Sequence, residues 1–446
     1  MEQDTIAAIS TPPGEGGIGI IRLSGPRAEE ILGRVFRRAR GDGEAWESHR
    51  MVYGTLRDGE QTVDEGMAVL MRAPRSYTRE DVAEIQLHGG SYVLQRGLEL
   101  CLEQGARLAG PGEFSRRAFL NGRIDLSQAE AVMSMISARG EMEHRAAVRE
   151  LQGGVTAFVR AAADRLYGIQ AGLAACVDYP EEISEEEGAA EMNPQLRDLI
   201  RTLREAIQER SSRMLHQGLR VTLAGRPNVG KSSLLNALLG EEKAIVTSLP
   251  GTTRDLVNGE MSLGGVRVAL TDTAGLRETE EEVEKIGVAR SRRAMEEADA
   301  VLLVLDGSAP LQQEDEALLD TLPERAAVVI NKQDLPQRLE LPEAAGERRV
   351  IRCSAKRPES LGEIKDCLRE WCVLSDRMAV THPRHLDALK RAVGFLESAL
   401  ATAETLPPDL AATDLQSAQQ ALGEITGDQV DEALLDRVFS TFCVGK

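Results

Sequence analysis

The spacing of apolar and polar residues divides the chain into regions of different period. In the first 118 residues, short β-branched runs lie between Gly and Pro turns, which predicts an α+β domain. Strands are expected at 18–23, 67–71 and 82–87, and helices at 28–38 and 91–104. A basic cluster is then the solvated end of the first helix, and it consists of Arg34, Arg37, Arg38 and Arg40.

The period becomes helical after the first domain. From residue 126 to about 216, Ala, Leu, Glu and Arg recur at helical spacing, which predicts two or three long helices. The acidic stretch 178–194 contains proline and interrupts the pattern, so a solvated loop is expected there. From residue 218 apolar strands alternate with helical segments, as in a doubly wound sheet. These strands are expected at 219–224, 266–270, 300–305, 326–330 and 350–353.

Helical spacing returns after about residue 374, so the predicted fold is multidomain. An α+β domain occupies 1–118, and an all-α domain is divided between 119–217 and 376–446. An α/β domain at 218–375 is inserted between the two helical halves.

Composition and charge narrow the class of protein. Hydrophobic residues make up 42% and charged residues 28%, and no apolar run approaches the ~20 residues that span a bilayer. The acidic first residues differ from the basic start of a secretory signal, so we expect a cytoplasmic protein without a membrane segment. The net charge of -19 disfavours indiscriminate binding to nucleic acid, because that affinity comes from lysine and arginine. Any such contact must be local or shared with a partner.

A phosphate-binding loop follows the strand expected at 219–224. Gly225-Arg226-Pro227-Asn228-Val229-Gly230-Lys231-Ser232 matches Gly-x-x-x-x-Gly-Lys-Ser/Thr and opens a helix expected at 233–239. Its backbone N–H groups would surround phosphate oxygens, Lys231 would neutralise them, and Ser232 would bind Mg²⁺. The residues predicted to bind the nucleotide here are Asn228, Val229, Gly230, Lys231, Ser232 and Ser233.

Two further segments predict that the base is guanine. Asn331-Lys332-Gln333-Asp334 follows the strand expected at 326–330, and an aspartate carboxylate accepts both the ring N–H and the exocyclic amine of guanine. The alternative, a helix-capping turn, has little weight once the phosphate loop is granted. Ser354, Ala355 and Lys356 follow another strand and offer a backbone N–H to the guanine carbonyl.

The remaining segments are in the order of a Ras-like GTPase. Asp272-Thr273-Ala274-Gly275 places Asp272 to reach Mg²⁺ through water and the Gly275 N–H to reach the γ-phosphate. Between the phosphate loop and Asp272 lies Gly251-Thr252-Thr253-Arg254-Asp255, where Thr253 is predicted to close on Mg²⁺ while γ-phosphate is present. The inserted domain is therefore predicted to be a P-loop GTPase domain.

Leu276 occupies the position of the glutamine that orients water in Ras-like enzymes. In other GTPases an arginine finger stabilises the charge of the transition state and raises the rate by roughly 10³ to 10⁵. In this chain, the charge stabilisation and the orientation of water must come from other groups. One candidate is a monovalent cation held by Asn228 and oxygens of 247–252. The other is a carboxylate among Glu278, Glu280, Glu281, Glu282 and Glu284, which on sequence alone also fit a mobile acidic loop.

With these motifs in place, the chain resembles the MnmE (TrmE) family of bacterial tRNA-modification GTPases, within the TrmE-Era-EngA-like P-loop GTPases, over essentially its whole length. Outside the G domain the resemblance rests on three segments. They are 8–25, Pro111-Gly112-Glu113-Phe114-Ser115 with Ala118-Phe119-Leu120-Asn121, and Phe442-Cys443-Val444-Gly445-Lys446.

The resemblance implies a homodimer with a folate-binding N-terminal domain that also takes part in dimerisation, and G domains that dimerise around K⁺ as GTP is hydrolysed. With the flavoprotein MnmG, in an implied heterotetramer, such a protein adds an aminomethyl or carboxymethylaminomethyl group to the wobble uridine of certain tRNAs. The implied cofactors are GTP, Mg²⁺, K⁺ and 5-formyl-tetrahydrofolate or a related tetrahydrofolate.

The resemblance also implies roles for individual residues. K⁺ is assigned to Asn228, Thr247, Leu249 and Thr252, and the nucleotide site extends through Ser248, Pro250, Gly251, Thr273 and Ala274. Glu284 would orient the attacking water. Folate is assigned to Arg22, Glu84, Arg123 and Lys446, although the family often has lysine at the position of Arg123. Cys443 would lie near the folate and take part in one-carbon chemistry, or be a buried structural cysteine.

Two other functions compete with this interpretation. A GTPase that only switches, such as an Era-type ribosome-assembly factor, shares the nucleotide motifs but not the flanking domains. A folate-dependent one-carbon transferase with a vestigial G domain would not need intact nucleotide motifs.

Overall fold

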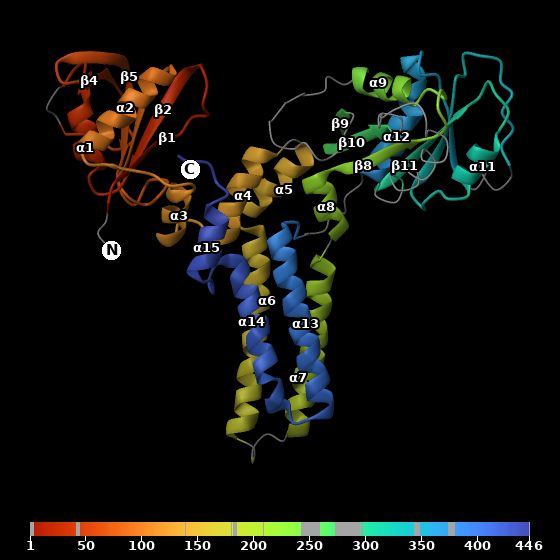
Figure 1. Cartoon of the computed structure of the whole chain (residues 1–446). Coiled ribbons are helices and arrows are strands. Elements are labelled where there is room, and N and C mark those ends of the chain that lie inside the picture. Colours follow the sequence, from red (N-terminus) through yellow and green to blue (C-terminus); the bar gives the residue numbers. More distant parts are fainter. Residues whose placement is uncertain are drawn as a thin grey trace, which may run out of the picture. The chain divides into compact units, whose positions relative to one another are not determined.

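The N-terminal region forms a mixed sheet covered by two helices. In the computed structural model, which describes residues 4–41, 45–138, 140–179, 181, 185–207, 209–241, 259–272, 295, 298–342, 348–372 and 380–445, the strand order is β3-β4-β5-β6-β2-β1-β7 (Figure 1). The strands are β1 Ile6–Ile9, β2 Gly16–Ser24, β3 Phe36–Arg38, β4 Val52–Asp58, β5 Gln61–Met71, β6 Val82–Gly89 and β7 Arg107–Leu108. All neighbouring strands are antiparallel except β1 and β7.

Helices α1 Ala28–Val35 and α2 Ser91–Glu103 pack on this sheet. Their apolar residues, such as Leu32 and Leu100, join Ile21 and Leu56 of the strands in one buried cluster. A short helix, α3 Glu113–Leu120, follows β7. The strands and helices expected in this region are confirmed, with one exception.

The helix expected at 28–38 ends at Val35, so the expected helical end at Arg37 and Arg38 is wrong. Phe36 adopts extended backbone, donates its N–H to the Leu32 carbonyl at the end of α1, and lies opposite Leu56 of β4 in the antiparallel pair. The Arg38 guanidinium lies over the Trp46 ring, 4.0 Å from its centroid. Sheet pairing, which no local pattern reveals, overrides the helix propensity of arginine.

The helical region before the G domain contains α4 Leu126–Ser137, α5 Glu141–Leu151, α6 Gly154–Asp178, α7 Glu185–Ala206 and α8 Glu209–Gln217. The two or three long helices predicted here correspond to α6 and α7, of 25 and 22 residues, while the shorter α4, α5 and α8 come in addition. Gly153, with φ 84°, makes a left-handed turn between α5 and α6, which only glycine adopts readily. Gln128 fixes the same turn by donating from Nε2 to the Leu151 carbonyl at 2.9 Å.

The prediction of a loop at 178–194 is wrong in its second half, because α7 begins at Glu185 and contains Pro194. Proline removes one helical hydrogen bond and is unfavourable inside a helix. Here Pro194 is exposed, while Met192, Leu196 and Leu199 are buried at helical spacing. Burial of that face outweighs the local preference against a helix.

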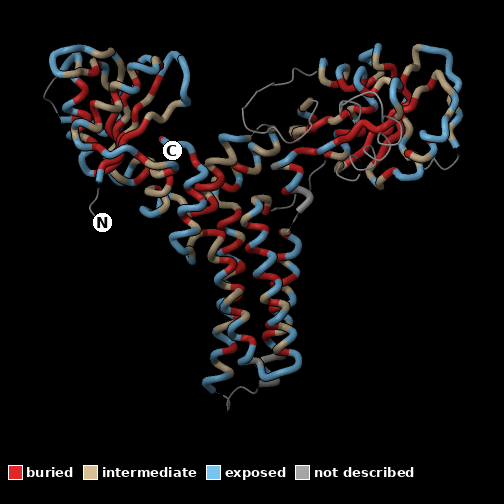
Figure 2. The backbone as a smooth tube through the Cα atoms, in the orientation of Figure 1, coloured by how far each residue is buried: buried red, intermediate tan, exposed pale blue. Residues whose placement is uncertain are grey.

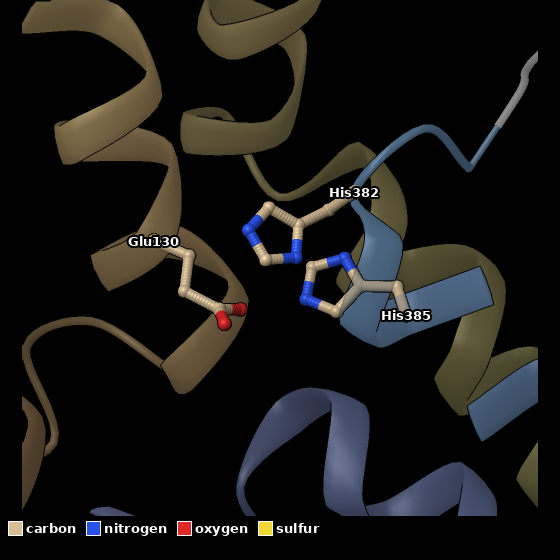
Figure 3. Close-up of side chains that lie close together, drawn as sticks. All are labelled: Glu130, His382 and His385. Atoms are coloured by element: carbon tan, nitrogen blue, oxygen red, sulfur yellow. The ribbon is translucent and has the colours of Figure 1, made fainter. Parts of the chain in front are cut away.

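After the G domain the chain returns to helices α13 Pro383–Thr405, α14 Ala412–Thr426 and α15 Glu432–Phe439. Helix α14 packs along α6, and Arg391 of α13 pairs with Glu424 of α14 (Figure 1). Figure 3 shows the imidazoles of His382 and His385 beside each other at the start of α13, with ring centroids 4.7 Å apart. His385 is fully buried. Glu130, also labelled in Figure 3, is a buried residue of α4.

The inserted domain is a doubly wound sheet with the order β13-β12-β11-β8-β10-β9. Its strands are β8 Leu219–Ala224, β9 Gly259–Leu263, β10 Val266–Asp272, β11 Ala300–Asp306, β12 Ala326–Asn331 and β13 Arg349–Arg352. All pairs are parallel except β9 with β10. Its helices include α9 Lys231–Glu241, α11 Gln313–Leu319 and α12 Gly362–Trp371.

The sheet of the inserted domain is the most continuously buried part of that domain (Figure 2). Alternate residues of β11 belong to different clusters, Leu302 and Val304 to one and Leu303 and Leu305 to the other, because side chains alternate across a strand. The predicted multidomain fold is confirmed. Helices in the described ranges are too short or too polar to cross a membrane.

Candidate nucleotide-binding site

The phosphate loop connects the end of β8 to the start of α9 (Figure 1). Gly225 has a backbone φ of 139° and Gly230 one of 98°, values that residues other than glycine rarely adopt. A Cβ on Gly225 would overlap the Val304 carbonyl oxygen, and a Cβ on Gly230 would overlap Asn331 Nδ2. Glycine is therefore needed at both positions because backbone and neighbouring side chain approach closely.

Lys231 and Ser232 begin α9 and face the loop. Lys231 Nζ donates to the carbonyl oxygens of Gly225 at 2.7 Å and Arg226 at 2.9 Å, and the residue is 5% exposed. Burial lowers the pKa of Lys231, and the Asp272 carboxylate acts in the opposite direction. Ser232 Oγ donates to Asp272 Oδ2. A buried cation beside a paired hydroxyl and carboxylate is an arrangement suited to phosphate and Mg²⁺.

The second loop follows β12 and is held against the first. Asn331, which is 2% exposed, donates from Nδ2 to the Val229 carbonyl at 3.0 Å and accepts from the Ala355 N–H at 3.0 Å. Lys332 Nζ donates to the Asn228 carbonyl at 2.9 Å. Asn331 and Lys332 thus connect the expected base-binding loop to the expected phosphate loop.

Asp334 carries the carboxylate that is predicted to recognise guanine. Its Oδ1 accepts from Ser354 Oγ at 2.7 Å, and Lys356 Nζ lies 3.6 Å from its Oδ2. The Ser354 hydrogen bond, the larger cause, and Lys356 lower the pKa of Asp334 below its ordinary value. An ionised carboxylate that faces a neighbouring backbone turn can accept from two guanine donors.

Sequence reasoning missed several residues that support these loops. Asp306, at the end of β11, accepts from Lys332 Nζ at 2.6 Å. Ser360 Oγ accepts from the Ser354 N–H at 2.9 Å. The position of Asp306 directly after an apolar strand was a usable signal, because parallel strands bring their carboxyl ends to one edge. Nothing in the local sequence indicated Ser360.

The structure brings together every described residue that the sequence predicted for the nucleotide. The other predicted residues lie outside the described ranges, and so does Leu276. They are Thr247, Ser248, Leu249, Pro250, Gly251, Thr252, Thr253, Thr273, Ala274, Gly275 and Glu284.

A second group of predicted residues meets in the N-terminal region. Arg22 Nε donates to Glu84 Oε1 at 2.9 Å across the β2–β6 pair, and Arg22 Nη1 donates to the Gly445 carbonyl at 3.4 Å. The Arg22 guanidinium lies 5.7 Å from the Phe114 ring centroid. The chain terminus is held there, since Ser10 Oγ also donates to the Gly445 carbonyl, at 3.1 Å.

The other residues assigned to folate lie around this group or beyond the described chain. Arg123 is 4.8 Å from the Tyr77 ring centroid and donates to the Tyr77 carbonyl at 3.3 Å. Cys443 is an exposed free thiol, so the alternative of a buried structural cysteine is wrong. Its carbonyl accepts from the Gly112 N–H at 3.3 Å, and Lys446 lies outside the described residues.

Comparison with known proteins covers the whole chain. The family model of the MnmE helical domain matches residues 126–443, and that of the GTP-binding protein TrmE N-terminus matches residues 5–123. Two proteins named tRNA modification GTPase MnmE are similar over 100% of this chain and 100% of their own length, that of Heliobacterium modesticaldum at 46% identity and that of Listeria welshimeri at 44%. The G domain of the FeoB iron transporter of T. maritima is 27% identical, with a TM-score of 0.25, over 35% of this chain and 99% of that chain.

Both flanking regions and the full length therefore match one family. An Era-type GTPase without those flanking domains does not account for such matches. The glycines and Lys231 form a loop between a strand and a helix, as the Gly-x-x-x-x-Gly-Lys-Ser/Thr pattern predicts, and Asn331 is hydrogen-bonded to that loop. The chain belongs to the MnmE (TrmE) family of tRNA-modification GTPases, and it is a GTP hydrolase that acts in tRNA modification.

Proposed function

We propose that this GTPase, with a flavoprotein of the MnmG type, adds a carboxymethylaminomethyl or aminomethyl group to the wobble uridine of certain tRNAs in the cytoplasm. The observation that carries the proposal is the meeting of Arg22, Glu84 and the Gly445 carbonyl in a chain that also has guanine-nucleotide loops. A protein that only switches needs no second ligand site. The net charge of -19 makes a shared tRNA surface, completed by the partner, the reasonable arrangement.

Within the nucleotide site, the loop 228–233 would hold the phosphates, and Asp334 with the Ser354–Lys356 turn would hold guanine. Ser232 and Thr253 would bind Mg²⁺, with Asp272 acting through water. The hydrogen bond from Ser232 Oγ to Asp272 Oδ2 supports this assignment, because Mg²⁺ binds several oxygen atoms that lie close together. Lys231 would move its donors from two carbonyl oxygens to phosphate.

The same site would use K⁺ in hydrolysis. Asn228, Thr247, Leu249 and Thr252 would surround the cation, and Glu284 would orient water as the G domains of a homodimer meet. Support comes from Asn228, whose φ of 64° is rare for a residue other than glycine, and from Leu276. GTP should be hydrolysed faster in K⁺ than in Na⁺, and equal rates would remove the cation from the proposal.

Glu284→Ala tests the water-orienting role separately. It should slow hydrolysis and leave GTP affinity nearly unchanged, because the role begins only in the transition state. A large loss of affinity would show that Glu284 is structural.

A tetrahydrofolate, 5-formyl-tetrahydrofolate or a relative, would bind at Arg22, Glu84, Arg123 and Lys446. The Arg22–Glu84 pair offers a carboxylate and a guanidinium side by side, which suits the donors and acceptors of a pterin ring. The exposed Cys443 is free to approach the one-carbon group. The domain limits 1–118, 119–217, 218–375 and 376–446 belong to the same proposal.

The decisive experiment deletes the gene and measures wobble uridines in total tRNA by mass spectrometry. The modified nucleosides should disappear and return when the intact gene is restored. A variant with Asp334→Ala should fail to restore them. Unchanged nucleosides in the deletion strain would refute the assigned reaction.

A further inference from the structure

The second residue of the phosphate loop, Arg226, directs its side chain to another helix. Its Nε donates to Asp315 Oδ2 at 2.9 Å, and its Nη1 donates to Gln312 Oε1. Both acceptors lie at the start of α11, which follows β11. The Arg226 side chain is 15% exposed and that of Asp315 is 3% exposed, so water screens this pair only weakly.

Asp315 is a buried carboxylate with few partners. Its Oδ2 also accepts from the Gln312 N–H at 3.2 Å, as part of a capping box, while its Oδ1 accepts no hydrogen bond from the described residues. Arg226 is the cation paired with this carboxylate in the described part of the chain. A buried charge of this kind is costly unless it is paired, so Asp315 holds Arg226 in one position.

The segment 306–315 is therefore linked to the phosphate loop twice, once through Lys332 and once directly. At one end, Asp306 binds Lys332, whose Nζ donates to the Asn228 carbonyl. At the other end, Asp315 binds Arg226, whose own carbonyl oxygen accepts from Lys231 Nζ. The two links reach the loop at Arg226 and Asn228, both in its first half.

We propose that Arg226 is a positioning residue for GTP, which fixes the phosphate loop through Asp315 so that its N–H groups converge before the nucleotide arrives. A loop that is already ordered loses less conformational entropy on binding. The side chain has this effect without touching GTP, because both of its acceptors lie on the protein. The inference rests on the proposed phosphate site at 228–233.

The test measures GDP and GTP binding to the full chain by calorimetry, together with its thermal unfolding. Arg226→Met should weaken both nucleotides about tenfold, the equivalent of one hydrogen bond to a charged group. At saturating GTP, kcat should change less than twofold, because the loop contacts phosphate in ground and transition state alike. The nucleotide affinity of Arg226→Lys should lie between those of Arg226→Met and the native protein, since lysine keeps the charge but cannot bind Asp315 and Gln312 together.

The double variant Arg226→Met, Asp315→Asn separates positioning from folding. It leaves no buried charge uncompensated and keeps an acceptor for the Gln312 N–H, so its Tm should return toward that of the native protein. Its GDP affinity should stay about tenfold reduced, because the loop is still unanchored. Recovery of affinity together with Tm would overturn the proposal, and so would Arg226→Met binding within twofold of the native protein.

Two further variants serve as controls. Arg220→Met removes another arginine–aspartate pair of the same domain, Arg220 Nε with Asp299 Oδ2 at 3.3 Å, whose arginine is 47% exposed and lies at the opposite end of β8. It should leave nucleotide affinity unchanged, and a tenfold loss there would overturn the proposal by showing that any such pair matters. Lys231→Ala should abolish GDP binding, and normal binding would refute the phosphate site itself, whatever Arg226 does.

Discussion

Asn331→Ala should weaken the connection between the two nucleotide loops, leaving the hydrogen bond from Lys332 to the Asn228 carbonyl. The amide of Asn331 is the bridge between them, with one hydrogen bond of 3.0 Å to the Val229 carbonyl and one of 3.0 Å from the Ala355 N–H. The residue is 2% exposed, so water cannot replace either bond directly. Alanine leaves one carbonyl and one N–H buried without their partner.

The magnitude follows from those two groups. A buried polar group left unsatisfied costs about 1–3 kcal/mol, which gives roughly 2–6 kcal/mol for the pair. Relaxation of the loops toward water favours the lower half of that range. At 1.4 kcal/mol per factor of ten, about 2 kcal/mol expressed wholly in binding would weaken GDP some 30-fold.

The assay combines GDP calorimetry with urea unfolding of the full chain, because the lost free energy divides between GDP affinity and folding stability. Asn331→Asp separates the two bonds, since it keeps the acceptor for Ala355 and places an oxygen against the Val229 carbonyl. Asn121→Ala is the control, because the Asn121 amide donates to the Thr78 carbonyl in the N-terminal region. If binding and unfolding together change by less than about 0.5 kcal/mol in Asn331→Ala, the bridge has no energetic role.

Three other outcomes are expected. Gly230→Ala should abolish GDP binding in a filter assay, because its Cβ would overlap Asn331 Nδ2 at φ 98°, whereas Gly240→Ala, with open space around its Cβ, should bind normally and unfold at an equal or higher temperature. Burial lowers the pKa of Lys231 from 10.5 and bound phosphate should raise it again, so GDP affinity is greatest below the pKa of the free protein and falls as pH rises through it. Calorimetry in two buffers at alkaline pH should then detect proton uptake on binding, and none would contradict the placement of Lys231. Arg22→Lys should weaken 5-formyl-tetrahydrofolate binding in a fluorescence titration about tenfold, since the contacts of Nε and Nη2 with Glu84 Oε1 are lost, while GTP hydrolysis by the isolated protein stays the same.

Local patterns were sufficient for much of the G domain. The five expected strands all form. The central strands β11 and β12 are apolar runs buried on both faces of a parallel sheet, whereas the edge strand β13 buries only Ile351 fully. The place of the phosphate loop between β8 and α9 was predictable, since a phosphate cradle requires glycines, a lysine and a hydroxyl at fixed spacing between a strand and a helix. Local patterns failed where contacts distant in sequence determine the secondary structure. Residues 36–38 form a strand because they pair with β4. The helix α7 continues through Pro194 because its other face is buried.

The sequence alone determined the class of nucleotide, the order of the motifs and the family, because these depend on residue types at fixed spacing along the chain. Only the tertiary structure decided what holds the motifs in place. Asn331 bridges two loops that are about a hundred residues apart in sequence, and Arg226 reaches Asp315 across a similar interval. The Gly445 carbonyl meets Arg22 from the other end of the chain. Such contacts leave no local pattern, because the residues become neighbours only after the sheets have paired and their polar groups have been buried.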